Sequence, residues 1–243
     1  MNSSRLPTAT FVNMLTVIIG GLIGLLISKS FPPELEKIIS QAIGLGVLVL
    51  GIQMALKMPE SYLLVFILSL ILGGSFGYLI HLDQLILGSS EWVKNMVQIT
   101  DSSFAEGMTN AFILFCVGSL TILGALEEGL QGKRNLLYVK SALDGISAVI
   151  FTTKFGVGVI FSVIPMLIFQ GGLTVLAGQL KEGVNQTKLN LISAVGGALI
   201  MGIGINVLEL TKINIENLLP ALVFLFPLAW LWKNLISNSK KIS

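Results

Sequence analysis

The chain has 243 residues, of which 53% are hydrophobic and only 12% charged, about half the charged fraction of an ordinary soluble domain. This composition excludes a soluble globular protein, and a net charge of +2 spread over the loops gives no basic face for nucleic acid. The single cysteine, Cys116, excludes an intramolecular disulfide and a cysteine-based metal cluster. We therefore expect one integral membrane domain over residues 1–243.

Eight apolar segments follow one another along the chain, at residues 11–28, 38–56, 61–80, 104–126, 141–154, 158–178, 189–209 and 217–234. Backbone groups in hydrocarbon must pair within the protein, and no segment alternates like a barrel strand. The sequence therefore predicts an all-α, polytopic transmembrane helical bundle. Because the first apolar run lacks the small residues of a cleavage site, we expect it to remain as the first transmembrane helix.

The Lys and Arg residues of the loops predict the orientation. With a cytoplasmic N-terminus, the outside set is Lys29, Lys37, Lys94, Lys154 and Lys212. The larger inside set is Arg5, Lys57, Lys133, Arg134, Lys140, Lys181, Lys188, Lys233, Lys240 and Lys241. Both termini are therefore predicted to be cytoplasmic. The linker 81–103 would lie outside, with an amphipathic turn or two and Trp92 at the interface.

Two glycine-rich stretches, AIGLGVLVLGIQMAL from Ala42 and AVGGALIMGIGINVL from Ala194, resemble each other. Chance similarity between two apolar helices is one explanation, and an internal repeat is the other. Since five spans separate them, the two copies would cross the membrane in opposite directions. Segments one to three would then pair with six to eight as an inverted repeat, an arrangement that places solute sites near the midplane.

Segment five, at about 14 residues, is shorter than the roughly 17–25 residues of a usual span. It ends in a polar, glycine-containing stretch that includes Thr152, Lys154, Gly156 and Gly158. This pattern predicts a short broken or re-entrant central helix, because irregular backbone at membrane depth is tolerated where it lines protein or water. The candidate hinges or helix breaks are Gly145, Gly156, Gly158, Pro165 and Gly171.

Charged residues near the centre of the sequence allow two interpretations each. Asp144 lies in the first turn of predicted segment five, where it either caps the helix or forms a buried ion or proton site. Glu127 and Glu128 belong to a solvated cytoplasmic loop, or else Glu127 ends a helix at the mouth of a cavity and binds a cation or proton. Lys154 either reaches the outer surface or balances Asp144.

Neutral polar residues within the apolar segments either bond helices together or contact a solute. The candidate ligands beside Asp144 are Ser119, Ser147, Thr152, Gln170, Asn13, Gln53 and Asn206. Asn110 belongs to the same class. The motifs Gly20-Gly21-x-x-Gly24 and Gly73-Gly74-x-x-Gly77 predict close helix packing within the chain, with a dimer contact as the alternative.

No sequence signature of an enzyme accompanies these residues. The chain has no G-x-S-x-G, no H-E-x-x-H, no P-loop and no Gly-x-Gly-x-x-Gly motif, and its one histidine, His81, ends segment three. We therefore predict no enzymatic activity, no metal site and no cofactor, and interpret Cys116 as a buried structural thiol.

The motifs FCVGSLTILGALEEGLQG, KSALDGISAVIF, FGVGVIFSVIP and FQGGLT resemble the YdfK/YqgA-type family of bacterial inner-membrane proteins, a domain of unknown function (554). The resemblance extends to Asn13 with its glycines and to AVGGALIMGIGIN, so it covers nearly the whole chain. Two departures stand out, at Glu127-Glu128 and at Lys154. The resemblance implies a multi-pass protein of the bacterial plasma (inner) membrane, and it implies no substrate.

The favoured function is a secondary transporter or channel-like carrier of a small polar solute or ion, with Asp144 as the coupling or ion-binding carboxylate. The alternative is a non-transporting membrane scaffold or sensor subunit, whose polar residues hold helices together. Either function requires the lipid bilayer as a partner, excludes nucleic acid, and leaves a homo-oligomer open.

Overall fold

The computed structural model describes residues 6–28, 32–96, 98–99, 102–117, 119–177 and 185–239, and within these it contains helices and no strand. The long helices of the first half are α1 (Thr8–Ser28), α2 (Pro33–Ala55), α3 (Leu63–Leu79), α4 (Leu82–Met96), α5 (Phe104–Cys116) and α6 (Ser119–Gln131), with the short 3₁₀ helix η1 (Glu60–Tyr62) before α3. The second half contains α7 (Asn135–Phe155), α8 (Gly158–Phe161), α9 (Val163–Met166), a π-helical segment η2 (Leu167–Gly171), α10 (Gly172–Val175), α12 (Gln186–Val207), α13 (Ile215–Leu218) and α14 (Ala221–Ser239).

In the part of the chain that the structure describes, seven helical stretches are long and apolar enough to cross a membrane. They are Thr8–Ser28, Lys37–Ala55, Glu60–Leu79, Asn135–Phe155, Gly158–Val175, Gln186–Val207 and Ile215–Asn234. An eighth crossing is formed if Phe104–Cys116 and Leu120–Gln131, bent by 64° to each other, make one broken span. The all-α bundle of about eight segments is therefore confirmed, in the predicted chain order.

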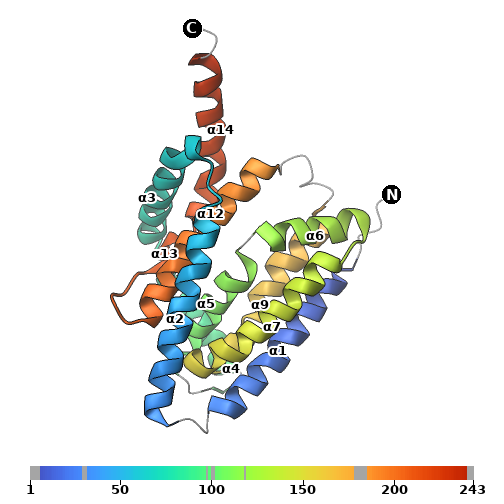
Figure 1. Ribbon diagram of the computed structural model, residues 1–243, viewed down its shortest axis with the longest axis vertical. Coiled ribbons are helices and arrows are strands. Elements are labelled where there is room, and N and C mark those ends of the chain that lie inside the picture. The colour runs from blue at the N-terminus through green and yellow to red at the C-terminus, as the bar shows by residue number, and fades with distance from the viewer. Residues whose placement is uncertain are drawn as a thin grey trace.

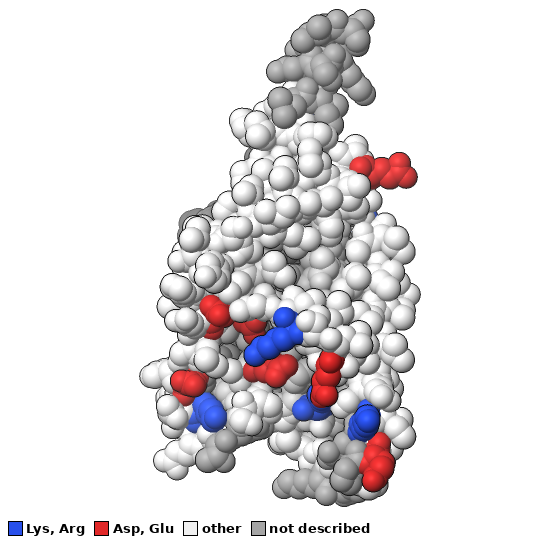
Figure 2. Space-filling model, turned by 90° about the vertical axis from the view of Figure 1, so that its left-hand side faces the viewer, with Lys and Arg blue, Asp and Glu red and all other residues white. Residues whose placement is uncertain are grey.

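Both termini lie in the upper half of the view in Figure 1, the C-terminus beyond α14 and the N-terminus beside α6, and α4 lies in the lower half. A chain with an even number of membrane crossings has both termini on the same side of the membrane, which agrees with this arrangement. In the linker 81–103, α4 is a helix of 15 residues, longer than the turn or two that the sequence suggested, and its Trp92 is exposed. Figure 2 shows most of the charged side chains of one face gathered on its lower part, below a broad, largely uncharged surface with an acidic side chain at its upper right edge.

Large apolar side chains are exposed on the flanks of the bundle. Examples on four different crossings are Leu26, Val139, Ile168 and Val223, all of them more than half exposed. Burying such side chains is worth about 1.5–3 kcal/mol each, so their exposure to water over a whole surface would be strongly unfavourable. This apolar surface is therefore suited to contact with lipid.

Glycines bring α1 and α7 into backbone contact. A Cβ atom on Gly20 would collide with the carbonyl oxygen of Gly145, and one on Gly24 would collide with that of Val149. The two helices run in the same direction, since residues further along α1 meet residues further along α7. The glycine motif of the first segment thus serves packing within the chain.

A second glycine-lined pair joins α2 to α12. A Cβ on Gly51 would lie 2.8 Å from the carbonyl oxygen of Gly197, and a Cβ on Gly204 would lie 3.0 Å from that of Gly44. These contacts make the two helices antiparallel, as expected for the two similar stretches that they contain. The wider inverted repeat of segments one to three with six to eight stays a prediction.

The break expected in segment five lies elsewhere. Helix α7 is continuous for 21 residues, so segment five is neither short nor broken, and Gly145 is not a helix break. The helix begins at Asn135, so Lys140 lies within it and not in a loop, and Asp144 lies near the middle of a span instead of in its first turn. The sharply bent crossing is α5–α6, before α7 in the chain, while the α8–α10 stretch after α7 is an irregular helix that forms one crossing of 18 residues.

Candidate functional site

The centre of the candidate site is an ion pair on α7. Lys140 and Asp144 are four residues apart, which places them on one helix face, and the Lys140 ammonium is in direct contact with Oδ2 of Asp144. Only 8% and 11% of their side-chain surfaces are exposed. Charged groups at membrane depth are costly unless they pair, so this position has to be explained by a structural or functional role.

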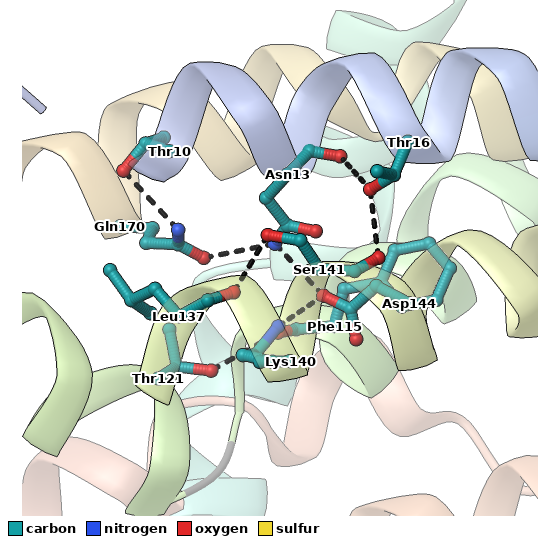
Figure 3. A network of polar contacts seen from close by, with 10 residues as sticks. All are labelled: Thr10, Asn13, Thr16, Phe115, Thr121, Leu137, Lys140, Ser141, Asp144 and Gln170. Atoms are coloured by element: carbon teal, nitrogen blue, oxygen red, sulfur yellow. Dashed lines mark hydrogen bonds and ion pairs between the residues drawn. The ribbon is translucent and has the colours of Figure 1, made fainter. Parts of the chain in front are cut away.

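Two amide side chains from other crossings complete the site (Figure 3). Asn13 on α1 donates from Nδ2 to Asp144 Oδ2 at 2.9 Å and to Gln170 Oε1 at 3.2 Å. Gln170 on the π-helical segment donates in turn to Thr10 Oγ1 at 3.2 Å. Asn13, Gln170 and Thr10 are fully buried. The network therefore links three crossings that are distant in sequence.

Hydroxyl groups fix the register of α1 against α7 beside this network. Thr16 Oγ1 on α1 donates to the carbonyl oxygen of Ser141 on α7 at 2.8 Å. Ser141 Oγ donates to the carbonyl oxygen of Leu137 at 2.7 Å, within α7. Together with the glycine contacts, these bonds hold Asn13 opposite Asp144.

Irregular backbone meets the site from two sides. Gln170 belongs to a π-helical stretch of five residues, a rare conformation that occurs frequently at functional sites. At the α5–α6 bend, Thr121 Oγ1 donates to the carbonyl oxygen of Phe115 at 3.1 Å, a bond that Figure 3 draws in the same close view as Lys140. Buried charges and interrupted helices therefore coincide in one region.

One acceptor of the network has no partner. Asn13 uses its amide nitrogen twice, while its Oδ1 is buried without a hydrogen bond among the described residues. An unpaired buried acceptor costs about 1–3 kcal/mol. A proton donor or a cation beside Asp144 would satisfy this oxygen.

A second buried carboxylate lies at the N-terminal end of α1. Glu128 on α6 is fully buried, and its Oε1 accepts from the backbone nitrogen of Ala9 at 2.9 Å and from Arg134 Nε at 2.9 Å. A negative charge at this end of α1 is stabilised by the helix dipole. The interpretation of Glu128 as part of a solvated loop is therefore wrong. Its Oε2 has no partner among the described residues.

Of the predicted ligands, Asp144, Asn13 and Gln170 lie together in the network. Ser147 instead lines an apolar crevice of about 350 Å³ between α2, α5 and α7. Thr152 is buried on α7 beside Gly21 and Gly24 of α1, and its hydroxyl has no partner among the described residues. Both lie outside the network.

The remaining predicted ligands are also separate from it. Gln53 is exposed on α2. Asn206 exchanges two hydrogen bonds with the backbone of Ile213, at 2.8 and 2.7 Å, and so closes the loop after α12. The side chain of Ser119 lies outside the described part of the chain. Lys154 pairs with Glu209 at 3.2 Å and not with Asp144.

Four of the five predicted hinge residues do lie at interruptions. Gly156 ends α7 with a φ of 65°, which favours glycine, and Gly158 begins α8 against the backbone of Phe104. Pro165 lies in the short α9, and Gly171 ends the π-helical segment.

The sequence analysis missed Lys140 as a site residue, along with Thr10, Thr16 and Ser141. A signal for Lys140 was present, because its spacing of four from Asp144 favours an ion pair on one helical face. Within the described residues, no group of three or more His, Cys, Asp and Glu side chains could hold a metal ion.

Comparison with known proteins agrees with the resemblance seen in the sequence motifs. The chain is 33% identical over 216 residues to the uncharacterized membrane protein YdfK of Bacillus subtilis (strain 168), covering 88% of this chain and 92% of that protein. It is 29% identical over 227 residues to the uncharacterized protein YqgA of Escherichia coli (strain K12), covering 91% and 96%. No solved structure matches the chain. Since residues 8–230 also match its family model, the chain belongs to the membrane-protein family described as "Protein of unknown function (DUF554)".

Proposed function

We propose that this protein is a secondary transporter or channel-like carrier that moves a small polar solute or ion across the bacterial plasma membrane. The observation that carries the proposal is the buried network in which Asp144 and Lys140 meet Asn13 and Gln170. The proposed function includes no enzymatic reaction and no DNA or RNA partner.

The position of the network supports transport over simple helix packing. A structural link between helices is served by neutral polar groups, which are worth about 0.6–2 kcal/mol each in membranes. A Lys–Asp pair adds a large desolvation cost that packing does not require. Charged groups at the meeting point of interrupted helices are instead typical of transporter binding sites.

In the proposed mechanism, Asp144 is the coupling carboxylate. A proton or cation that binds Asp144 neutralises the charge that holds Lys140, and the freed ammonium then requires another acceptor. The carbonyl groups at the α5–α6 bend, or an anionic group on the solute, supply one. Gln170 can follow the change because the π-helical segment that carries it lacks the regular hydrogen bonding of an α-helix.

The proposed orientation places both termini in the cytoplasm. Lys140 lies within a span and leaves the predicted inside set, which keeps nine Lys and Arg residues against five outside. The end of the molecule that carries α4 then faces the outside of the cell.

The test is flux through purified protein reconstituted in liposomes. A trapped pH indicator reports proton movement under an imposed pH gradient and membrane potential, and a panel of labelled ions and polar metabolites is screened in parallel. We expect flux above that of empty liposomes for the parent protein, and at least a tenfold loss in Asp144→Asn and in Lys140→Met.

The matched control is Glu60→Gln, which neutralises an exposed carboxylate outside the network and should keep the parent rate. Folding of each variant is checked by its elution as a single species in size-exclusion chromatography. Folded parent protein without flux for any gradient would favour the alternative, a scaffold or sensor. Flux that is unchanged in Asp144→Asn would remove this residue from the mechanism.

A further inference from the structure

A pocket of about 660 Å³ opens at the end of the molecule opposite the termini, away from the Asp144 network. Its walls come from the start of α4, the first turns of α5, and the chain from Asn206 through the loop 208–214 to α13. Ligand pockets of small molecules typically measure about 300–1,000 Å³, so this pocket has the size of a binding site.

The pocket is lined by more negative than positive groups. Its ionisable residues are Asp83, Glu106, Glu209, Glu216 and Lys212. Asp83 accepts a hydrogen bond from Asn214 at 3.2 Å, and Glu209 is paired with Lys154, which lies outside the pocket. Figure 2 shows acidic and basic side chains gathered at this end of the molecule.

Glu106 and Glu216 differ from the other two carboxylates. Neither has a hydrogen bond or an ion pair among the described residues, although both line one pocket, where their like charges repel each other. The positive charges of Lys154 and Lys212 also act on Glu106 and offset part of this repulsion. They belong to different elements, α5 and α13, so the fold itself brings the two negative charges to one pocket. A cation in the pocket would reduce this repulsion.

The most buried polar side chain of the pocket has a donor without a partner among the described residues. Asn110 lies one helical turn beyond Glu106 on the same face of α5, is only 2% exposed, and lines the pocket. Its Nδ2 has no acceptor among the described residues. A buried donor of this kind costs about 1–3 kcal/mol when it stays unpaired, and a ligand with an acceptor atom would satisfy it.

A metal ion does not fit this arrangement. No three of the described carboxylates lie close enough together to hold one metal, and an amide nitrogen donor cannot ligate it. The groups are instead spread over a pocket that accommodates a small organic molecule.

We propose that this pocket binds a small organic ammonium compound that also carries a hydroxyl or carbonyl acceptor. Its ammonium group lies between Glu106 and Glu216, and its acceptor takes the hydrogen bond of Asn110. The site is independent of the transport proposal, because equilibrium binding requires no movement across the membrane.

The test is isothermal titration calorimetry on the full chain in lipid nanodiscs, with three matched probes. Glucosamine has an ammonium group and hydroxyl acceptors, glucose lacks the charge, and cyclohexylamine lacks the acceptors. The pH is held at about 6.5, where amines and carboxylates are both ionised. We expect glucosamine to bind at least about tenfold more tightly than either of the other probes, since each lost charge-assisted bond is worth about one decade.

Two variants separate the roles of the groups. Glu106→Gln, at an exposed side chain, should weaken glucosamine binding about tenfold or more, whereas Asn110→Ala should weaken glucosamine and leave cyclohexylamine unchanged. Glu91→Gln removes an exposed carboxylate of α4 outside the pocket and serves as the control.

Three results would overturn the proposal. They are a glucosamine dissociation constant weaker than about 10 mM, equal binding of glucosamine and glucose, and equal effects of Glu106→Gln and Glu91→Gln. None of them depends on flux, so the binding site and the transport function can fail separately.

Discussion

Removing one charge of the Lys140–Asp144 ion pair, and then both charges, tests whether the pair is shielded from water as its small exposed fractions indicate. The three variants are Lys140→Met, Asp144→Asn and the double variant. In each single variant one charge stays behind in a site where only 8% or 11% of the side chain is exposed. Removing one partner of a buried pair costs about 3–5 kcal/mol, because the other charge is left without compensation.

The two single variants leave different groups behind. In Lys140→Met, the Asp144 carboxylate keeps the hydrogen bond from Asn13, which is a neutral donor. In Asp144→Asn, the Lys140 ammonium keeps only an amide oxygen as its acceptor. The double variant leaves no buried charge, and replacing buried pairs by uncharged groups is often close to neutral. We expect its unfolding free energy within about 2 kcal/mol of that of the parent.

The measurement is thermal unfolding in one detergent, followed by the intrinsic fluorescence of the three tryptophans. For a chain of about this size, 1 kcal/mol corresponds to roughly 2–4 °C, so each single variant should lose about 6–20 °C. The double variant should be more stable than either single variant. The reasoning would be refuted if each single variant lowered the unfolding temperature by less than about 2 °C and the loss in the double variant equalled the sum of the two. That result would mean that water reaches the ion pair.

Two further variants test the packing and the second buried carboxylate by the same unfolding measurement. Gly20→Ala forces a methyl group against the Gly145 carbonyl oxygen and should cost about 1–3 kcal/mol, whereas Gly46→Ala meets nothing within 4 Å and should be neutral or stabilising. Equal effects of the two glycine variants would contradict the close approach of α1 and α7. Glu128→Ala removes the acceptor for the N-terminus of α1 and should cost about 1–3 kcal/mol, while Glu127→Ala, at a half-buried neighbour, should cost less than about 0.5 kcal/mol. A smaller loss for Glu128→Ala than for its neighbour would show that the carboxylate is hydrated.

The crossings could be predicted from the sequence because hydrocarbon imposes a simple requirement on length and polarity. Six of the eight predicted segments agree with the structure to within a few residues, while the predicted segment 104–126 is divided into α5 and α6, which are bent by 64° to each other. Segment five was mistaken because Lys140 was interpreted as the end of a loop. A lysine at membrane depth is rare, and only its pairing with Asp144 makes it stable there.

The network was only partly predictable for a related reason. Asp144, Asn13 and Gln170 stood out because polar groups in apolar segments are costly. Which of them meet depends on how helices pack, and no spacing in the sequence shows that Asn13 faces Asp144 across 131 positions. The burial of Glu128 against α1 could not be predicted, because one of its two partners is the backbone nitrogen of Ala9, and a backbone group leaves no trace in residue identity. Its other partner, Arg134, lies in the same charged stretch and fitted the interpretation as a loop equally well.

The glycine contact between α1 and α7 limits how this part of the molecule can move. Sliding by one residue would shift α1 by about 1.5 Å and drive the side chains next to Gly20 and Gly24 into the backbone of α7. We therefore expect the two helices to move together as one rigid body, with Asn13 kept beside Asp144. Gln170 lies outside this body, so a structural change at the site should appear first as a loss of its bond to Asn13.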